Sequence, residues 1–197
     1  MQYFNIILFD DFETLDAFGP AEIIGKLPKA YTLKYHSLNG GIVKSSQKAS
    51  IETLSFADID TSGILLIPGG MGTRILVNDD IFIKQLRVLS EKAPYVLTVC
   101  TGSALLAKTG LLQGKCATSN KLAFDWVCRN GNDVHWVKKA RWVSDDKYYT
   151  SSGVSAGMDM TLEFISDIHG EKTADDLCKY IEYIRNKDKD NDPFADT

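Results

Sequence analysis

The stretch that most constrains the fold runs from Pro94 to Gly114, because it takes a buried strand directly into a helix with a cysteine at the junction. Residues 95–99 form a short, almost continuous apolar run ending in a β-branched residue, as in a strand covered on both faces. Residues 103–108 are rich in alanine and leucine, which is typical of a helix. Cys100 therefore follows a strand, where the amides that begin the next helix favour a thiolate.

The residues around this junction are similar to the nucleophile elbow, G-x-S-x-G, in which small neighbours tolerate a strained turn. Residues 98–102 read Thr-Val-Cys-Thr-Gly, so sulfur takes the place of the serine oxygen. Cys100 is accordingly a candidate nucleophile. The alternative, that Cys100 is a small buried hydrophobic residue, stays open here because free cysteines are commonly buried.

A second candidate lies near the start of the chain. Residues 3–9 are an apolar run that predicts a first buried strand, and Pro20 predicts the first residue of a helix that runs to about Gly25. This interpretation places Asp16 in the loop after the first strand, at the same carboxyl edge of a parallel sheet as Cys100. A carboxylate beside a thiol can accept or return its proton, so Asp16 is a candidate acid–base group. The alternative is a solvated loop aspartate.

A glycine-rich loop follows another buried strand, GILLI, at residues 63–67. The loop reads Pro-Gly-Gly-Met-Gly at residues 68–72. Its glycines let the backbone approach a ligand and present unobstructed amides, as an oxyanion site requires, although a plain tight turn is the alternative. We therefore take Gly69 and Met71 as candidate pocket residues.

The remaining pattern alternates strands and helices. Strands are predicted at 31–38, near residues 42 and 51, at 116–117, at 134–137 and in a hairpin over 140–150. Helices are predicted at 79–92 with Asn78 as cap, at 121–129, after the small-residue loop 151–157, and after a capping box at 173–176, with Ile184 facing inward. The loop 151–157 includes Ser155 as a further candidate pocket residue. This order predicts an α/β fold with a parallel sheet and helices on both sides.

The composition indicates one globular domain over residues 1–197, with 44% hydrophobic residues and a net charge of -4. Acidic and basic residues are interspersed, so no basic face for nucleic acid is visible. The start lacks the features of a signal peptide, and no apolar run approaches the roughly 20 residues that span a bilayer. We therefore expect a cytoplasmic protein with neither a nucleic-acid nor a membrane partner.

The four cysteines are widely spread, with no C-x-x-C pair and no histidine at zinc-ligand spacing. We expect reduced thiols and no metal site. The histidines are expected in structural positions: His36, His135 and His169.

Three segments together resemble the DJ-1/PfpI (ThiJ) superfamily. They read LDAFGPAE at 15–22, CTGSALLAKTGLLQGK at 100–115 and SSGVSAGMDMTLEFI at 151–165. With the glycine-rich loop after a central strand, their order and spacing fit along nearly the whole chain. Within the superfamily the likeness is greatest to isonitrile hydratase-like members, next to intracellular protease- and amidase-like ones.

The resemblance implies a flavodoxin-like, three-layer α/β sandwich of the class I glutamine amidotransferase-like type, with a mostly parallel central sheet. It also implies a homodimer and no bound cofactor. By position in these motifs, Cys100 matches the nucleophile and Asp16 its acidic partner. Thr101 matches the hydroxyl residue that follows the cysteine, and Gly70 and the Thr101 amide match backbone donors of an oxyanion site.

Two departures from the family pattern concern the substrate. Thr101 stands where protease-like members have a histidine, which counts against a Cys-His peptidase. Residues 118–121 read Thr-Ser-Asn-Lys where hydratase relatives often have Thr-Thr-His-Trp, so we expect a different pocket edge.

The leading hypothesis is a cofactor-independent cysteine hydratase or hydrolase of a small carbon–nitrogen compound, such as an isonitrile converted to an N-substituted formamide. The alternative is a redox-responsive or protein-protective member in which Cys100 is oxidised to a sulfinate. A ligand-sensing regulator domain is disfavoured, because only residues 185–197 follow the last apolar helix, too few for a DNA-binding module. We expect the acid and the thiol to titrate as a pair, with the pKa of Asp16 raised and that of Cys100 lowered.

Overall fold

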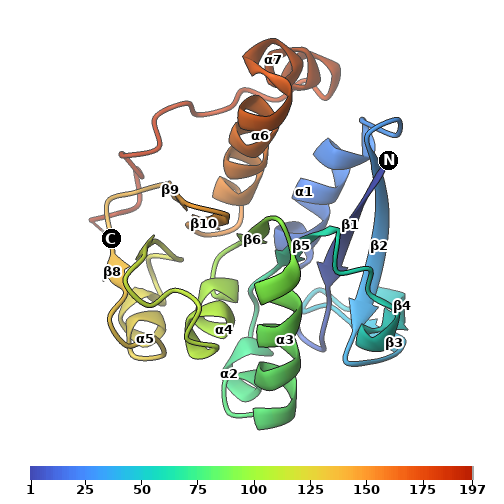
Figure 1. The fold of residues 1–197 in the computed structure, drawn as a ribbon. Coiled ribbons are helices and arrows are strands. Elements are labelled where there is room, and N and C mark those ends of the chain that lie inside the picture. The colour runs from blue at the N-terminus through green and yellow to red at the C-terminus, as the bar shows by residue number, and fades with distance from the viewer. Residues whose placement is uncertain (197) are drawn as a thin grey trace.

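The computed structural model describes residues 1–196, which form an eight-stranded sheet in the order β3-β4-β2-β1-β5-β6-β10-β9. A separate pair, β7-β8, lies beside one end of this sheet (Figure 1). The strands are β1 (Gln2–Ile7), β2 (Tyr31–Ser37), β3 (Asn39–Lys44), β4 (Ser50–Ser55), β5 (Ile64–Ile67), β6 (Val96–Thr98), β7 (Cys116–Ala117), β8 (His135–Trp136), β9 (Trp142–Asp145) and β10 (Tyr148–Ser151).

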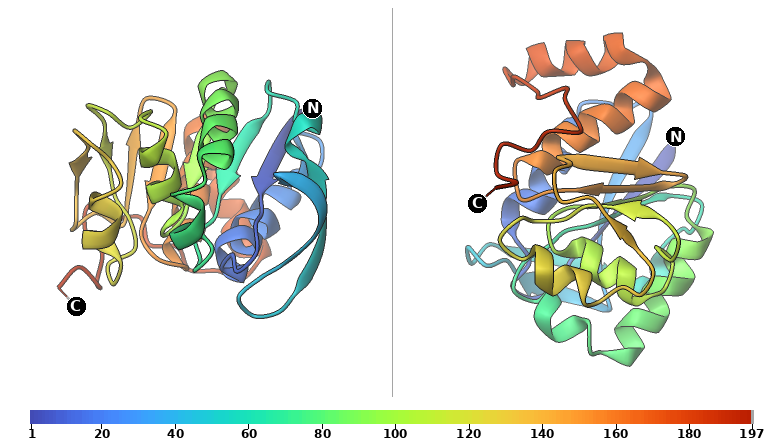
Figure 2. Two further views of the ribbon diagram at one scale, coloured as in Figure 1. Left: turned by 90° about the horizontal axis from the view of Figure 1, so that it is seen from below. Right: turned by 90° about the vertical axis from the view of Figure 1, so that its left-hand side faces the viewer.

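The helices cover both faces of the sheet, as the sequence predicts. They are α1 (Thr14–Gly25), α2 (Thr73–Leu76), α3 (Asp80–Lys92), α4 (Gly102–Lys108), α5 (Phe124–Cys128), α6 (Ala156–His169) and α7 (Glu171–Tyr180). Helices α2, α3 and α4 lie on one face and α1 and α6 on the other (Figures 1 and 2). The central strands β5 and β6 consist entirely of buried residues, because both of their faces are covered.

Most neighbouring strands run parallel, and antiparallel pairing is confined to the two edges. The parallel pairs are β1-β2, β1-β5, β5-β6, β6-β10 and β2-β4. The antiparallel pairs are β3-β4 and the predicted hairpin β9-β10. The α/β sandwich with a mostly parallel sheet is therefore confirmed, and the carboxyl ends of β1, β5 and β6 lie side by side.

Helix α1 corrects the position expected for the first acid. It begins at Thr14 and contains Pro20, rather than beginning at that proline. A proline usually forces the preceding residue out of the helical region, but Gly19 has no Cβ to clash with the ring. Asp16 consequently lies in the first turn of α1 and is completely buried, so the interpretation as a solvated loop aspartate was wrong.

Other helix boundaries also differ from the predicted ones. The cap of α3 is Asp79 rather than Asn78, since Asp79 Oδ1 accepts the N–H groups of Ile81 and Phe82, each at 3.0 Å. Helix α7 begins at Glu171, before the predicted capping box, and Ile184 is 95% exposed rather than inward-facing. Helix α5 is shorter than predicted, and the short helix α2 was not predicted.

Two further observations bear on the sequence analysis. His36 is completely buried, and its ring nitrogens hydrogen-bond with Asn5 Oδ1 and Ser55 O, both at 3.1 Å, which confirms a structural role. Along residues 1–196, no helix combines the length and apolar character that crossing a bilayer requires.

Candidate active site

Three predicted site residues come together at the carboxyl edge of β1, β5 and β6. Asp16 follows β1, Gly69 follows β5, and Cys100 follows β6. Next to them lies a cavity of about 280 Å³. It is lined by Glu13, Gly70, Met71, Arg74, Cys100, Thr101, Asn120, Leu122, Ala123 and Val154.

Cys100 occupies a strained backbone position. Its φ of 55° lies in the left-handed region, which costs a residue with a Cβ roughly 1–2 kcal/mol. Three hydrogen bonds hold it there. The Cys100 N–H donates to Ser152 O at 3.1 Å, and its carbonyl accepts from Ser119 Oγ at 2.8 Å and from Ser103 Oγ at 3.0 Å. The strand-to-helix junction is therefore a nucleophile elbow in geometry as well as in sequence.

The Asp16 carboxyl group lies next to the cysteine and is shielded from water. Its Oδ2 accepts the Gly69 N–H at 2.9 Å, and the Cys100 thiol also interacts with the side chain. Burial raises the pKa of Asp16 to about 7, and the charge of Glu13 adds to this, while the bonds from Gly69 and Cys100 oppose it. The raised pKa is the direction that we expected. Near neutral pH, Asp16 therefore exchanges a proton readily.

The thiol behaves differently from the expectation. Burial raises the pKa of Cys100, and the neighbouring Asp16 charge raises it further. The amides of Thr101 and Val154 lie close to the sulfur and lower the pKa, as anticipated for a helix start, but their effect is smaller. The expected lowering was wrong because Cys100 is only 8% exposed and its sulfur lies next to the Asp16 carboxyl group. The resting cysteine is a thiol with a base beside it.

Gly69 fits this site only because it lacks a side chain. A Cβ there would lie 2.6 Å from Thr101 N, 2.7 Å from Thr101 Oγ1 and 2.9 Å from Asp16 Oδ2. Gly69 thus forms the wall between the acid and Thr101 rather than a surface of the cavity. Gly69 was predicted as a pocket residue, but it lies behind the residues that line the cavity, because its backbone packs against Thr101 and Asp16.

The hydroxyl of Thr101 is engaged with the glycine-rich loop. Thr101 Oγ1 accepts the Gly70 N–H at 3.1 Å and lies 3.1 Å from Thr73 Oγ1. Gly70, with φ of 126°, therefore directs its amide at this hydroxyl. An oxyanion role for the Gly70 amide stays a prediction, since it requires the Thr101 hydroxyl to turn aside. The Thr101 and Val154 amides are the donors that already face the sulfur.

Met71 and Ser155 lie in different parts of the pocket. Met71 lines the Cys100 cavity and is 65% exposed at its mouth. Ser155 lines an adjoining cavity of about 380 Å³, which shares Asn120, Leu122 and Val154 with the first. The small-residue loop 151–157 is therefore a wall, as predicted, but Ser155 faces the outer compartment.

Five lining residues were not named in the sequence analysis: Glu13, Arg74, Leu122, Ala123 and Val154. Arg74 follows the glycine-rich loop by two residues, and that short spacing is the signal that could have identified it.

Residues 118–121, which depart from the family pattern, include one residue that lines the pocket and one that points away from it. Asn120 lines the pocket, as expected for a pocket edge, whereas the Lys121 ammonium points away and donates to Ala140 O at 2.7 Å.

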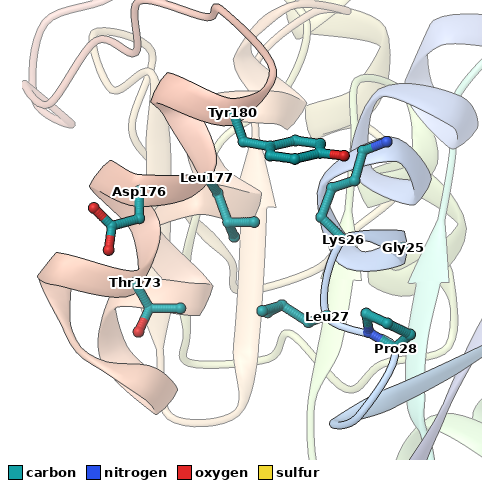
Figure 3. A pocket seen from close by; sticks show the side chains of 8 residues that line it. All are labelled: Gly25, Lys26, Leu27, Pro28, Thr173, Asp176, Leu177 and Tyr180. Atoms are coloured by element: carbon teal, nitrogen blue, oxygen red, sulfur yellow. The ribbon is translucent and has the colours of Figure 1, made fainter.

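A larger cavity, about 510 Å³, lies elsewhere, between the end of α1 and α7 (Figure 3). Figure 3 shows Lys26 extended alongside the Tyr180 ring, with its ammonium 5.2 Å from the ring centroid. No cysteine lines this cavity, its acid Asp176 has a pKa lowered by the hydrogen bond from Lys172, and Lys26 pairs with Glu22 at 2.8 Å. The candidate active site is therefore the smaller cavity at Cys100.

Within the described residues, no group of three or more His, Cys, Asp or Glu side chains is placed to hold a metal ion.

Comparison with known proteins shows the family of the chain. Residues 4–167 match the DJ-1/PfpI family. The chain belongs to this family. It is 30% identical to the isonitrile hydratase of Pseudomonas putida over 182 residues, which are 91% of this chain and 77% of that protein.

Solved structures of the DJ-1/PfpI fold superpose on most of the chain. A ThiJ/PfpI family protein from Pseudomonas syringae has a TM-score of 0.85 and 25% identity, covering 94% of this chain and 76% of that one. Drosophila melanogaster DJ-1beta has a TM-score of 0.78 and 21% identity, covering 93% and 98%. The first likeness supports family membership, and the second supports the shared DJ-1/PfpI fold.

Proposed function

We propose that this protein is a cofactor-independent cysteine hydratase or hydrolase of a small carbon–nitrogen compound, with hydration of an isonitrile to an N-substituted formamide as the reaction. The observation that carries the proposal is the buried Asp16 carboxyl group beside Cys100, with a pKa raised to about 7. A general base is most effective when its pKa lies near the working pH. The similarity to an isonitrile hydratase along 91% of the chain supports the choice of substrate class.

The first chemical step joins the sulfur to the substrate carbon. The Asp16 carboxylate accepts the Cys100 proton as the sulfur bonds to the terminal carbon of R–N≡C. Asp16 then returns that proton to the same carbon, which gives the thioimidate R–N=CH–S–Cys. The amides of Thr101 and Val154 stabilise negative charge that develops at the sulfur.

The second step releases the product. Water adds to the thioimidate carbon, its hydroxyl forming the new C–O bond and its other proton going to nitrogen. The C–S bond then breaks, the hydroxyl proton passes through Asp16 to the sulfur, and R–NH–CHO leaves. The Thr101 hydroxyl, which is held by the glycine-rich loop, orients the water in this scheme.

The direct test is turnover of a small alkyl isonitrile, with the formamide product measured by NMR. Cys100→Ala should abolish turnover, and Cys116→Ala, which removes an exposed cysteine, should not. Asp16→Asn should lower kcat by about 10²–10⁴-fold with a smaller effect on KM, because a proton acceptor is lost. Turnover that persists in Cys100→Ala would exclude this mechanism.

The second candidate function is redox sensing, in which peroxide oxidises Cys100 to a sulfinate. The observation in its favour is the carboxyl group next to the sulfur, whose pKa is raised to about 7. Its protonated form is therefore present near neutral pH and can donate a hydrogen bond to a sulfinate oxygen. Mass spectrometry after mild peroxide treatment separates the two functions. Stable, selective addition of two oxygens at Cys100, without turnover of any isonitrile, would favour the sensor.

We further propose a homodimer in the cytoplasm, on the resemblance to family members. Sedimentation equilibrium measures the assembly state. A single species at twice the 21.9 kDa chain mass is expected.

A further inference from the structure

The cavity at Cys100 contains one cation, Arg74, whose guanidinium lies flat against an aromatic ring. Its Cζ is 3.4 Å from the centroid of the Trp126 ring. Arg74 belongs to α2 and Trp126 to α5, so two separate elements hold the guanidinium in place. Stacking of this kind fixes the plane of the group and leaves its edge available for hydrogen bonds.

No protein group of the described residues satisfies this guanidinium. Arg74 takes part in none of the ion pairs that these residues form. Its Nη1 is buried and has no hydrogen-bond partner among them. A buried donor without a partner is costly, and the two arginines whose whole side chains are buried, Arg141 and Arg185, each lie within ion-pair distance of a carboxylate. Arg74 is thus a charge for which the fold supplies no counter-ion.

Arg74 is also electrostatically linked to the nucleophile. Burial lowers the pKa of Arg74, and a charge on Cys100 raises it. Both line the same cavity of about 280 Å³. A ligand small enough for this cavity can reach the sulfur and the guanidinium together.

The other charge in the cavity restricts the kind of anion. Glu13 lines the wall, and its Oε1 accepts a hydrogen bond from Gln47 Nε2 at 2.8 Å. Its negative charge disfavours a doubly charged group such as phosphate. A carboxylate carries one charge and matches the guanidinium edge with two oxygens.

We propose that Arg74 binds a carboxylate of the substrate, so that the enzyme acts on small carbon–nitrogen compounds that carry a carboxylate, such as an isonitrile with a carboxylate substituent. The inference rests on the proposed function for the reacting group. Arg74 would hold the carboxylate while the carbon at the other end of the molecule meets Cys100. Specificity for charged over neutral substrates follows from this one contact.

The test compares two alkylating reagents of nearly equal size at Cys100, iodoacetate and iodoacetamide, with rates measured by peptide mass spectrometry. The ratio of the two rates cancels the intrinsic reactivity of the thiol, so it reports recognition of the carboxylate alone. The reactivity of exposed Cys116 in the same samples is the internal reference. The variants are Arg74→Gln and Arg74→Lys, with Arg129→Gln as the control that removes an exposed arginine.

In the wild-type protein, Cys100 should favour iodoacetate by a larger ratio than Cys116. Arg74→Gln should lower this ratio about tenfold or more, as the loss of a charge-assisted hydrogen bond predicts. Arg74→Lys should recover part of it, and Arg129→Gln should leave it unchanged. Glu13→Gln should raise the ratio, because it removes a repelling charge.

An equal ratio in wild type and Arg74→Gln, with both proteins folded by circular dichroism, would overturn the inference. Because alkylation requires no turnover, this result is independent of whether any isonitrile is hydrated. Conversely, a lowered ratio together with no hydration of either charged or neutral isonitriles would support the carboxylate site and exclude the proposed function. Protection of Cys100 from iodoacetamide by phosphate but not by propionate would also overturn the carboxylate assignment.

Discussion

Burial of the Asp16 carboxyl group raises its pKa into the range useful for proton transfer, and it also makes the charged form destabilising. A carboxyl group that is buried beside Cys100 keeps its proton up to a pKa of about 7, compared with 3.8 for an ordinary aspartate. The residue types of this pair could be predicted from the sequence, because an elbow cysteine and an acid follow neighbouring parallel strands. The direction of the thiol pKa could not, since it depends on burial and on the distance between two side chains. The position of Arg74 beside the cavity was not predicted either, because it depends on how the folded elements pack around Cys100.

The first prediction is that Asp16→Asn stabilises the protein at pH 8 more than at pH 4. Between about pH 4 and 7 the folded chain retains a proton that the unfolded chain releases, so the stability of the wild type falls as the pH rises through this window. The rise in pKa from 3.8 to about 7 corresponds to at most about 4 kcal/mol.

Urea unfolding at both pH values measures this difference, with Asp190→Asn, at an exposed position, as the control. If the difference in free energy of unfolding between Asp16→Asn and the wild type is the same at pH 4 and pH 8, Asp16 is not held in an unfavourable charged state.

At the scale of elements, the central strands and most helices could be predicted because apolar periodicity determines which faces are buried. The boundaries could not be predicted equally well. Helix α1 extends through Pro20 because Gly19 removes a steric clash, and α3 is capped by Asp79 rather than by the adjacent asparagine. Both outcomes depend on local geometry. The elbow at Cys100 was recognised from its small neighbours, and its strain is visible only in the backbone angle.

The second prediction concerns that strain. Cys100→Gly should be more stable than Cys100→Ala by roughly 1 kcal/mol, because glycine adopts a φ of 55° without the steric cost of a Cβ. Cys116 provides the matched control, since in strand β7 glycine should be less stable than alanine. Thermal or urea unfolding of the four variants measures both differences. The same order at both positions, with alanine the more stable, would show that the elbow is unstrained.

At the scale of the whole molecule, the segment after α7 returns across the fold to the side of β9 and β8 (Figure 1). Asp192 anchors it. Its carboxylate is completely buried, 3.6 Å from Lys121 Nζ and 3.8 Å from Arg141 Nη1, and Arg141 also pairs with Asp159 at 2.6 Å. The sequence analysis did not predict this arrangement, because a mostly polar segment has no pattern that identifies its partners. Its partners lie about 50 and 70 positions earlier in the chain.

The third prediction is that Asp192→Ala destabilises the protein by about 3 kcal/mol, because it removes the carboxylate beside the buried Lys121 ammonium and leaves Arg141 with Asp159 alone. Asp190→Ala, two residues away on the exposed part of the segment, should change the free energy of unfolding by less than about 0.5 kcal/mol. Equal effects of the two substitutions would show that the tail is not anchored by this cluster.

The central claim, that Asp16 and Cys100 work as one proton-exchanging pair, is tested most directly by the rate of Cys100 alkylation with neutral iodoacetamide as a function of pH. Burial and the Asp16 charge both raise the pKa of the thiol. Asp16→Asn removes the second cause, so the midpoint of its rate profile should lie at lower pH than that of the wild type, although turnover is lost. Superimposable profiles for the two proteins would contradict the account, because they would show that the acid and the thiol do not interact.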